Sequence, residues 1–225
     1  MHILFINQFY KPDVAATGQL LGDLAEDLVQ RGHAVHVICG RSHYNGGTLG
    51  PVGASQVDGV WVHRVRTIGF GRRRLLGRAI DYLSFYLSAN WRALRLPKAD
   101  VCVSLTTPPL ISLIGLMLSK LKGTKHVIWM MDVYPEIAVA YDVLSERSLL
   151  HRLLARINRR LYRNAEAVIS LGEVMSRRLE EAGAAAEKIH IVHNWVPGEP
   201  GNLPRRIPVG RLDLPHHRTL AEGAM

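Results

Sequence analysis

Short runs of apolar residues alternate along most of this chain with longer segments in which apolar residues recur every three or four positions. Continuous runs of this length predict buried strands, and the recurring pattern predicts amphipathic helices. The predicted strands cover residues 3–8, 34–39, 60–65, 100–105, 126–131, 167–171 and 188–192. The predicted helices cover residues 75–95, 109–122, 147–163 and 173–183. A further helix is predicted between Thr17, a suitable N-cap, and Gly32, a suitable residue just after a helix.

The alternation of buried strands with amphipathic helices is typical of a parallel sheet that is covered by helices on both faces. The sequence therefore predicts a doubly wound, mostly parallel, Rossmann-like α/β domain, whose ligands bind at the carboxyl ends of the strands. The apolar pattern stops near Pro197. We expect one domain over residues 1–197, followed over 198–225 by an irregular linker or tail rich in proline, arginine and histidine.

The composition fits a globular protein, because 48% of the 225 residues are hydrophobic. Cys39 and Cys102 each end an apolar run without the spacing of a zinc site, so buried free thiols in a reducing cytoplasm are expected. Met1 leads directly into a predicted strand, which argues against a signal peptide. Residues 101–119 carry no charge, but Pro108 interrupts them, so we expect a strand, a turn and a helix rather than a membrane span.

The net charge of +9 fits an anionic partner such as a phosphorylated substrate, an acidic lipid surface or nucleic acid, or simply a solvated surface. Two basic stretches lie beside apolar residues with helical spacing, as in helices that bind anionic membranes. Nucleic acid is disfavoured, because neither exposed aromatic residues among the basic ones nor a recognition helix is evident. The arginines of these stretches are Arg72, Arg73, Arg74, Arg152, Arg156, Arg159 and Arg163.

Two of the loops that follow predicted strands carry residues suited to binding a phosphate or a sugar. Thr17 and Gly18 fall at a helix start, where free N–H groups attract anions and a glycine lets a phosphate approach, although a lone glycine at a helix start is more often part of an ordinary turn. The G-x-G-x-x-G fingerprint of nicotinamide and flavin enzymes is absent. After the second strand, His43, Tyr44 and Asn45 can hydrogen-bond to a sugar and stack on it, although such loops also form plain turns.

A third candidate loop follows the strand predicted at 126–131. Asp132 can orient a sugar hydroxyl or draw off its proton, and Glu136 supplies a second carboxylate, so both are candidate catalytic residues. Tyr134 offers an aromatic face and is a candidate substrate contact. The alternative is that the two carboxylates cap the next short helix. No candidate metal ligands accompany them.

Six segments occur in order along the chain: "ILFINQFYKPDVAATGQLLGDLAEDLVQRGHAVHVICGR", "YNGG", "LSFYLSA", "TTPPL", "DVYPEIAVAYDVL" and "ISLGEVMSRRLEEAGAAAEKIHIVHNWVPGE". Together they resemble the N-terminal half of family 4 glycosyltransferases. The resemblance covers residues 2–199 and is strongest to bacterial enzymes that build cell-surface polysaccharides, a group that includes colanic acid fucosamine transferases.

This resemblance implies one half of a GT-B enzyme, in which two Rossmann-like lobes face each other across a cleft. In such enzymes the N-terminal lobe binds the acceptor, often a lipid-linked sugar at the inner face of the cytoplasmic membrane. The C-terminal lobe binds the nucleotide-sugar donor. These enzymes retain the anomeric configuration and need no metal ion or other cofactor. By this resemblance Thr17 and Gly18 would approach the donor phosphates, and Asp132 with its neighbours would line the acceptor side.

The resemblance also implies that "HNWVPGE" marks the point where the first lobe joins the second. A donor lobe needs roughly a hundred residues or more. The residues that remain do not resemble a donor lobe. A shifted reading frame, a gene truncation or the end of an expressed fragment would each explain this. One hypothesis is an acceptor half whose donor half is a separate chain, and the other is a non-catalytic truncated or accessory binding domain. We expect a cytoplasmic protein, peripheral at the inner membrane face, that releases no nucleotide by itself.

Overall fold

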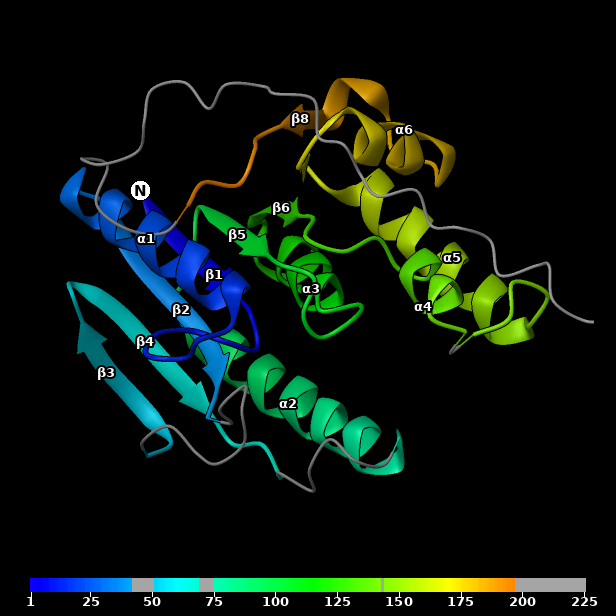
Figure 1. The fold of residues 1–225 in the computed structure, drawn as a ribbon. Helices are drawn as coiled ribbons and strands as arrows, with labels where there is room; N and C mark the ends of the chain where they lie inside the picture. The colour runs from blue at the N-terminus through cyan, green and yellow to red at the C-terminus, as the bar shows by residue number, and fades with distance from the viewer. Residues whose placement is uncertain (42–50, 69–74, 143, 197–225) are drawn as a thin grey trace, which may run out of the picture.

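The computed structural model describes residues 1–41, 51–68, 75–142 and 144–196. They form an α/β domain in which helices lie on both faces of an eight-stranded sheet (Figure 1). The strands are β1 (His2–Ile6), β2 (Ala34–Gly40), β3 (Gly53–Val57), β4 (Val60–Val65), β5 (Val101–Ser104), β6 (Lys125–Trp129), β7 (Ala167–Ser170) and β8 (Ile189–Ile191). The helices are α1 (Ala16–Gln30), α2 (Leu75–Arg95), α3 (Ser112–Lys122), α4 (Glu136–Ala140), α5 (Leu149–Asn164), α6 (Glu173–Glu181) and the 3₁₀ helix η1 (Ala186–Lys188). The predicted fold class is confirmed.

The order of the strands in the sheet is β3-β4-β2-β1-β5-β6-β7-β8, and all neighbours are parallel except β3 and β4. From the central β1 the chain adds strands on one side, through β2 and β4, and later on the other side, from β5 to β8. The order therefore reverses between β1 and β5. In open parallel sheets ligands bind at such a point, beyond the carboxyl ends of the strands.

The antiparallel strand β3 is a feature that the apolar pattern did not predict. Its side chains are mostly exposed, so it lacks the apolar run that marks the buried strands. β3 forms a hairpin with β4 through Asp58 and Gly59, whose φ angles are 50° and 80°. Two positive φ angles are what a two-residue hairpin turn requires, and Asp-Gly is a preferred pair there. The sequence signal for this hairpin was thus its turn rather than its strand.

The two faces of the sheet pack against different helices. On one face, Phe5 of β1 and Leu21 of α1 belong to the same buried cluster. On the other face, Ile6 and Phe85 join β1 to α2 and α3, and Leu161 lies in a third cluster that joins β6 and β7 to α5 and α6. Within the described part of the chain, no helix combines the length and the apolar content needed to cross a membrane.

Three helices begin at positions other than those predicted, and α5 does so by only two residues, at Leu149. The first begins at Ala16 with Ala15 as its N-cap, so the prediction of Thr17 as the N-cap was wrong. The turn before it is instead ordered by Asp13, whose carboxylate accepts a hydrogen bond from the N–H of Ala15 at 3.2 Å. α3 begins at Ser112, because residues 108–111 form a turn. The predicted end of the first helix is confirmed, since Gly32 follows it with a φ of 85°.

A buried polar cluster lies where β5, β6 and α3 meet. The imidazole Nε2 of His126 lies 2.8 Å from the hydroxyl of Ser104, which lies 2.9 Å from the hydroxyl of Ser112. Burial lowers the pKa of His126 to about 4, so the ring is neutral near pH 7. The predicted burial of Cys39 and Cys102 as free thiols is confirmed, and burial raises the pKa of each to about 12.

The segment after β8 runs back across the domain toward α1 (Figure 1). The ring of Trp195 stacks on that of Trp129, with a centroid distance of 5.8 Å, and its Nε1 donates to Asp23 of α1 at 3.4 Å. Trp195 also packs against the apolar cluster between α1 and the sheet. The last described residues are therefore attached to both a strand and a helix.

Candidate functional site

The loop after β1 is held in place by the ends of its two neighbouring strands. The N–H of Gln8 donates to the carbonyl of Thr107 after β5 at 2.9 Å, and the N–H of Gly40 in β2 donates to the carbonyl of Gln8 at 2.9 Å. The side-chain amide of Asn7 donates to the carbonyl of Phe9 at 2.8 Å. These bonds fix the backbone of the loop at the point where the strand order reverses.

Gly18 brings α1 close to this loop. A Cβ at this position would lie 3.2 Å from the carbonyl carbon of Phe9 and 3.3 Å from the nitrogen of Tyr10, which is closer than ordinary contact. The missing side chain therefore lets the first turn of α1 pack on the loop. A phosphate contact at Gly18 stays a prediction.

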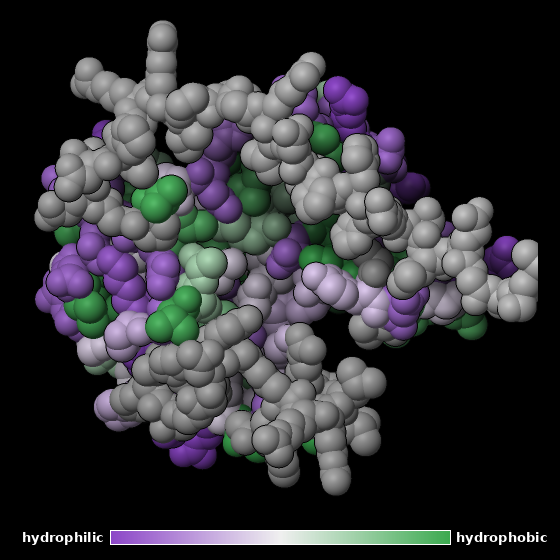
Figure 2. All heavy atoms as spheres, in the orientation of Figure 1, coloured by the Kyte–Doolittle hydropathy of each residue, from purple (hydrophilic) through white to green (hydrophobic). Residues whose placement is uncertain are grey.

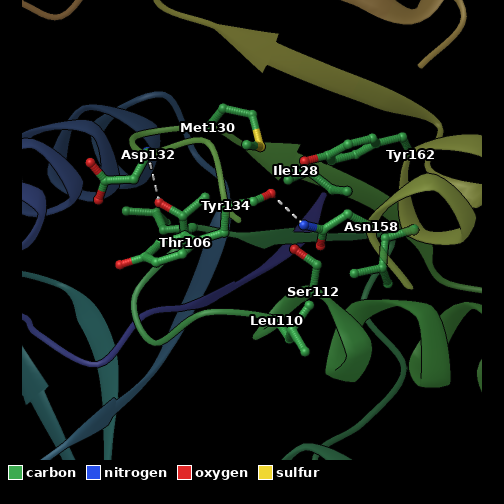
Figure 3. Close-up of a pocket in the computed structure, with 11 residues that line it drawn as sticks. Thr106, Leu110, Ser112, Ile128, Met130, Asp132, Tyr134, Asn158 and Tyr162 are labelled. Atoms are coloured by element: carbon green, nitrogen blue, oxygen red, sulfur yellow. Dashed lines mark hydrogen bonds between the residues drawn. The ribbon is translucent and has the colours of Figure 1, made fainter. Parts of the chain in front are cut away.

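The loop after β6 carries Asp132 and Tyr134, and it is tied to elements on both sides (Figure 3). The N–H groups of Met131 and Asp132 donate to the hydroxyl of Thr106 at 3.3 Å and 3.2 Å. On the other side, the side-chain amide of Asn158 in α5 donates to the carbonyl of Tyr134 at 2.5 Å. The carboxylate of Asp132 is half-buried, and this desolvation raises the pKa of its carboxyl.

The loops after β1, β5 and β6, together with α2, line a cleft of about 560 Å³. It lies beyond the carboxyl ends of β1, β5 and β6, where the topology predicts a ligand. Its polar and aromatic lining residues are Gln8, Phe9, Thr17, Tyr82, Thr107, Asp132 and Tyr134. Behind it, a cavity of about 20 Å³ shares Asp132 and Tyr134 and reaches Ser112 and Tyr162 (Figure 3), which is room for about one water molecule.

Glu136 begins α4 and does not line this cleft. It lines two further hollows, of about 220 Å³ and 400 Å³, and Arg178 of α6 borders both. Asp132 shares only the larger of them with Glu136. One carboxylate oxygen of Glu136, Oε2, is buried and has no hydrogen-bond partner among the described residues. Neither carboxylate caps α4, since its N-cap is Pro135 and no side chain bonds to that end.

The structure thus brings together three of the residues selected from the sequence: Thr17, Asp132 and Tyr134. Gly18 lies beside them, and Glu136 lies in the adjoining hollow. His43, Tyr44 and Asn45 fall outside the described residues, as do Arg72, Arg73 and Arg74. Sequence reasoning missed Tyr82, Gln8 and Thr107. In the described ranges, no three histidine, cysteine or carboxylate side chains are grouped so that they could hold a metal ion.

The basic helix predicted at 147–163 corresponds to α5, whose first turns extend beyond the sheet (Figure 1). Arg152, Arg156, Arg159 and Arg163 are exposed, as expected for the polar face. The apolar stripe is buried only in its second half, because Leu149, Leu150 and Leu153 are exposed. On the face shown in Figure 2, α1 and α6 present mainly hydrophilic side chains, and apolar ones gather in the hollow between them.

Replacing Asp132 with asparagine is expected to raise thermal stability at neutral pH. Because the pKa of this carboxyl is raised in the folded protein, it favours folding only when protonated. That contribution is lost as the pH rises from the unfolded-state pKa through the raised folded-state pKa. Melting curves should therefore show a higher Tm for the variant at about pH 7, and a difference that vanishes below about pH 4. An equal or lower Tm for the variant at neutral pH would contradict this account.

The chain matches known proteins over most of its length. Residues 16–195 match the family described as "Glycosyl transferase 4-like domain". Over 126 residues the chain is 29% identical to the probable glycosyltransferase WbjE of Pseudomonas aeruginosa, which covers 55% of this chain and 31% of that protein.

Solved structures share the fold at lower identity. HepE of Anabaena, in complex with UDP and glucose, is 18% identical with a TM-score of 0.51. Sucrose-phosphate synthase of Thermosynechococcus elongatus is 12% identical with a TM-score of 0.61. Each match covers 86% of this chain but only 44% and 48% of those proteins, so the chain spans less than half of their length. Since the family match includes α1, the loop after β6 and Trp195, the chain belongs to the family of glycosyltransferase 4-like domains.

Proposed function

We propose that this domain is the acceptor-binding lobe of a glycosyltransferase that transfers a sugar from a nucleotide-sugar donor to a glycan in cell-surface polysaccharide synthesis. The observation that carries the proposal is the cleft of about 560 Å³ at the reversal of the strand order. It brings a carboxylate, Asp132, and two tyrosines, Tyr82 and Tyr134, to one opening. Membership of the family supports the activity, and the complex of HepE with UDP and glucose supports the class of substrates.

Within this cleft each side chain has a role that suits an acceptor sugar. Asp132 would accept a hydrogen bond from a sugar hydroxyl and draw off its proton, and the raised pKa of its carboxyl brings it nearer to the pH at which a base works best. Tyr82 and Tyr134 would stack on the faces of the sugar ring. Thr17 would meet the donor phosphates with Gly18, and Glu136 would act from the adjoining hollow.

Transfer requires a second lobe to bind the donor. The described residues form a single sheet, and the relatives are more than twice as long as the part this chain matches. We propose that the domain over residues 1–197 works with a donor lobe outside it. Without the second lobe the domain would bind an acceptor and catalyse no transfer.

The acceptor that we propose is a lipid-linked sugar at the inner face of the cytoplasmic membrane. The arginines on the exposed face of α5 and the net charge of +9 suit an anionic lipid surface. The domain would then be a peripheral protein, held at the membrane by charge and by exposed apolar side chains.

A binding experiment tests the acceptor role of the cleft. Saturation-transfer NMR with a soluble, short-chain prenyl pyrophosphate sugar should show transfer to the sugar protons with the wild-type chain. Asp132→Asn should weaken this binding about tenfold, as expected for the loss of a charged hydrogen bond. Asp58→Asn, which changes a carboxylate to an amide in the exposed hairpin turn, is the matched control and should bind like the wild type. Equal binding by Asp132→Asn and the wild type would refute the assignment.

An assay of nucleotide release separates the lobe from a complete enzyme. The purified chain should release neither UDP nor GDP from the corresponding sugar nucleotides, with or without the acceptor probe. Release by the chain alone would refute the dependence on a second lobe. If the chain neither releases nucleotide nor binds the acceptor probe, the proposed function itself fails.

A further inference from the structure

The outer side of α2 carries a stripe of large apolar residues that nothing in the described structure covers. We define the outer stripe of α2 as Ile80, Leu83, Leu87, Trp91 and Leu94, whose exposed fractions lie between 40% and 65%. At about 100° per residue these five positions fall within an arc of about 80° on the helix surface, over a length of about 20 Å. Since apolar surface of this extent is uncommon on soluble monomers, the stripe requires a partner.

This stripe is distinct from the side of α2 that packs on the sheet. Phe85, Ala89 and Ala93 are fully or almost fully buried and point the opposite way. They already supply the contact of α2 with the domain core. The outer stripe is therefore not needed to hold α2 on the sheet.

The charges beside the stripe are positive. Arg95 lies with its guanidinium 4.0 Å from the centre of the Trp91 ring, and Lys98 follows just beyond the helix. Within the described residues of α2, Asp81 is the single acidic side chain, and it lies about 100° around the helix from Ile80. An anionic surface would complement exposed Arg95 and Lys98, whereas a second copy packed in parallel on this stripe would bring like charges together.

The first turn of the stripe and the proposed acceptor cleft lie at the same end of α2, on different sides of the helix. Tyr82, which lines the cleft, points about 100° away from Leu83 and about 160° away from Ile80 around the helix. A surface lying along the stripe would therefore cover the outer side of α2, and the cleft would open on the inner side at the N-terminal end of the helix. An acceptor whose lipid stays in that surface could place its sugar in the cleft without leaving the membrane.

We propose that the outer stripe of α2 lies on an anionic membrane, with its apolar side chains at the boundary of headgroups and acyl chains and Trp91 as the interfacial anchor. This inference rests on the proposed function, because it supplies the route by which a lipid-linked acceptor reaches the cleft. It assigns the main contact to α2 rather than to the basic α5.

Co-sedimentation of the full chain with vesicles tests this assignment. Vesicles of phosphatidylcholine mixed with phosphatidylglycerol should bind the wild type, and pure phosphatidylcholine should bind it less. Leu87→Ser combined with Trp91→Ser should weaken binding to the mixed vesicles by at least about tenfold, since each apolar side chain loses its burial in the interface. The matched control is Leu149→Ser combined with Leu153→Ser, at similarly exposed leucines of α5, and it should bind like the wild type. Near-UV circular dichroism and the Tm verify that both variants fold.

The outcomes separate this inference from the proposed function. Asp132→Asn should bind vesicles normally although it loses the acceptor probe, and the α2 double variant should bind the soluble probe normally although it loses vesicles. Failure of the wild type to bind anionic vesicles, or equal binding by the α2 double variant, overturns the proposal. So does a dimer, detected by analytical ultracentrifugation, that the α2 double variant abolishes in place of membrane binding. Loss of vesicle binding in the α5 control alone would mean that α5, rather than α2, makes the main contact with the membrane.

Discussion

Replacing Phe85 with alanine is expected to lower the free energy of unfolding by about 3–5 kcal/mol, the usual cost of removing a buried phenylalanine. The ring is fully buried between α2 and the sheet and belongs to a cluster with Ile6, Ile38 and Ile114. Since these neighbours come from β1, β2 and α3, they cannot all move to fill the space that the ring leaves. The loss should appear in urea unfolding as a lower midpoint with an unchanged slope.

The matched control lies two residues further along the same helix. Leu87 is 65% exposed, so Leu87→Ala should change the free energy of unfolding by no more than about 0.5 kcal/mol. This pair of variants reports which side of α2 faces the sheet. Similar losses in the two variants would mean that α2 is rotated from the orientation described, and the outer stripe would then not be free for a membrane.

Replacing Gly115 with alanine is expected to destabilise the domain by about 1–3 kcal/mol, the usual cost of overpacking a core. A Cβ on Gly115 would lie 2.1 Å from Cδ2 and 2.2 Å from Nε2 of His126. The ring cannot easily turn aside, because it is 1% exposed and its Nε2 is hydrogen-bonded to Ser104. Alanine is otherwise the better residue inside a helix by about 1 kcal/mol, so a net loss identifies the contact with the ring as the cause.

A double-mutant cycle tests that cause. His126→Ala alone should destabilise the domain, because it leaves a cavity and removes the partner of Ser104. In that background Gly115→Ala should become neutral or stabilising, since the ring that it would strike is gone. An equal loss in both backgrounds would contradict the contact. Urea unfolding of the four proteins gives the coupling energy directly.

The fold was predictable wherever burial produced an apolar run. The strands β1, β2 and β4 to β7 were all expected, because each is largely buried and lies beside an amphipathic helix. β8 was expected from its apolar run, although most of its side chains are exposed. β3 was missed because its exposed side chains produce no apolar pattern, although Asp58 and Gly59 carried the turn signal. The start of α1 was misplaced because an aspartate before the helix, Asp13, orders the turn that a threonine N-cap was expected to order.

The candidate site was predictable only in part. Asp132 and Tyr134 stand directly after a buried strand, so the rule for parallel sheets pointed to them. Tyr82 lies in the middle of a long helix, and nothing near it in sequence shows that this turn of α2 reaches the cleft. The outer stripe of α2 was hidden for a different reason. The helix is apolar on two sides, and the sequence does not say which of Phe85 and Leu87 faces the sheet.

The attachment of Trp195 decides where any segment beyond it can turn. Trp195 stacks on Trp129 and donates a hydrogen bond to Asp23, so the short strand β8 is not the last part of the chain that contacts the domain. Its last fixed point is displaced toward α1. If the domain works with a donor lobe as proposed, the chain would leave the domain toward that lobe from a point beside α1 rather than from the end of β8.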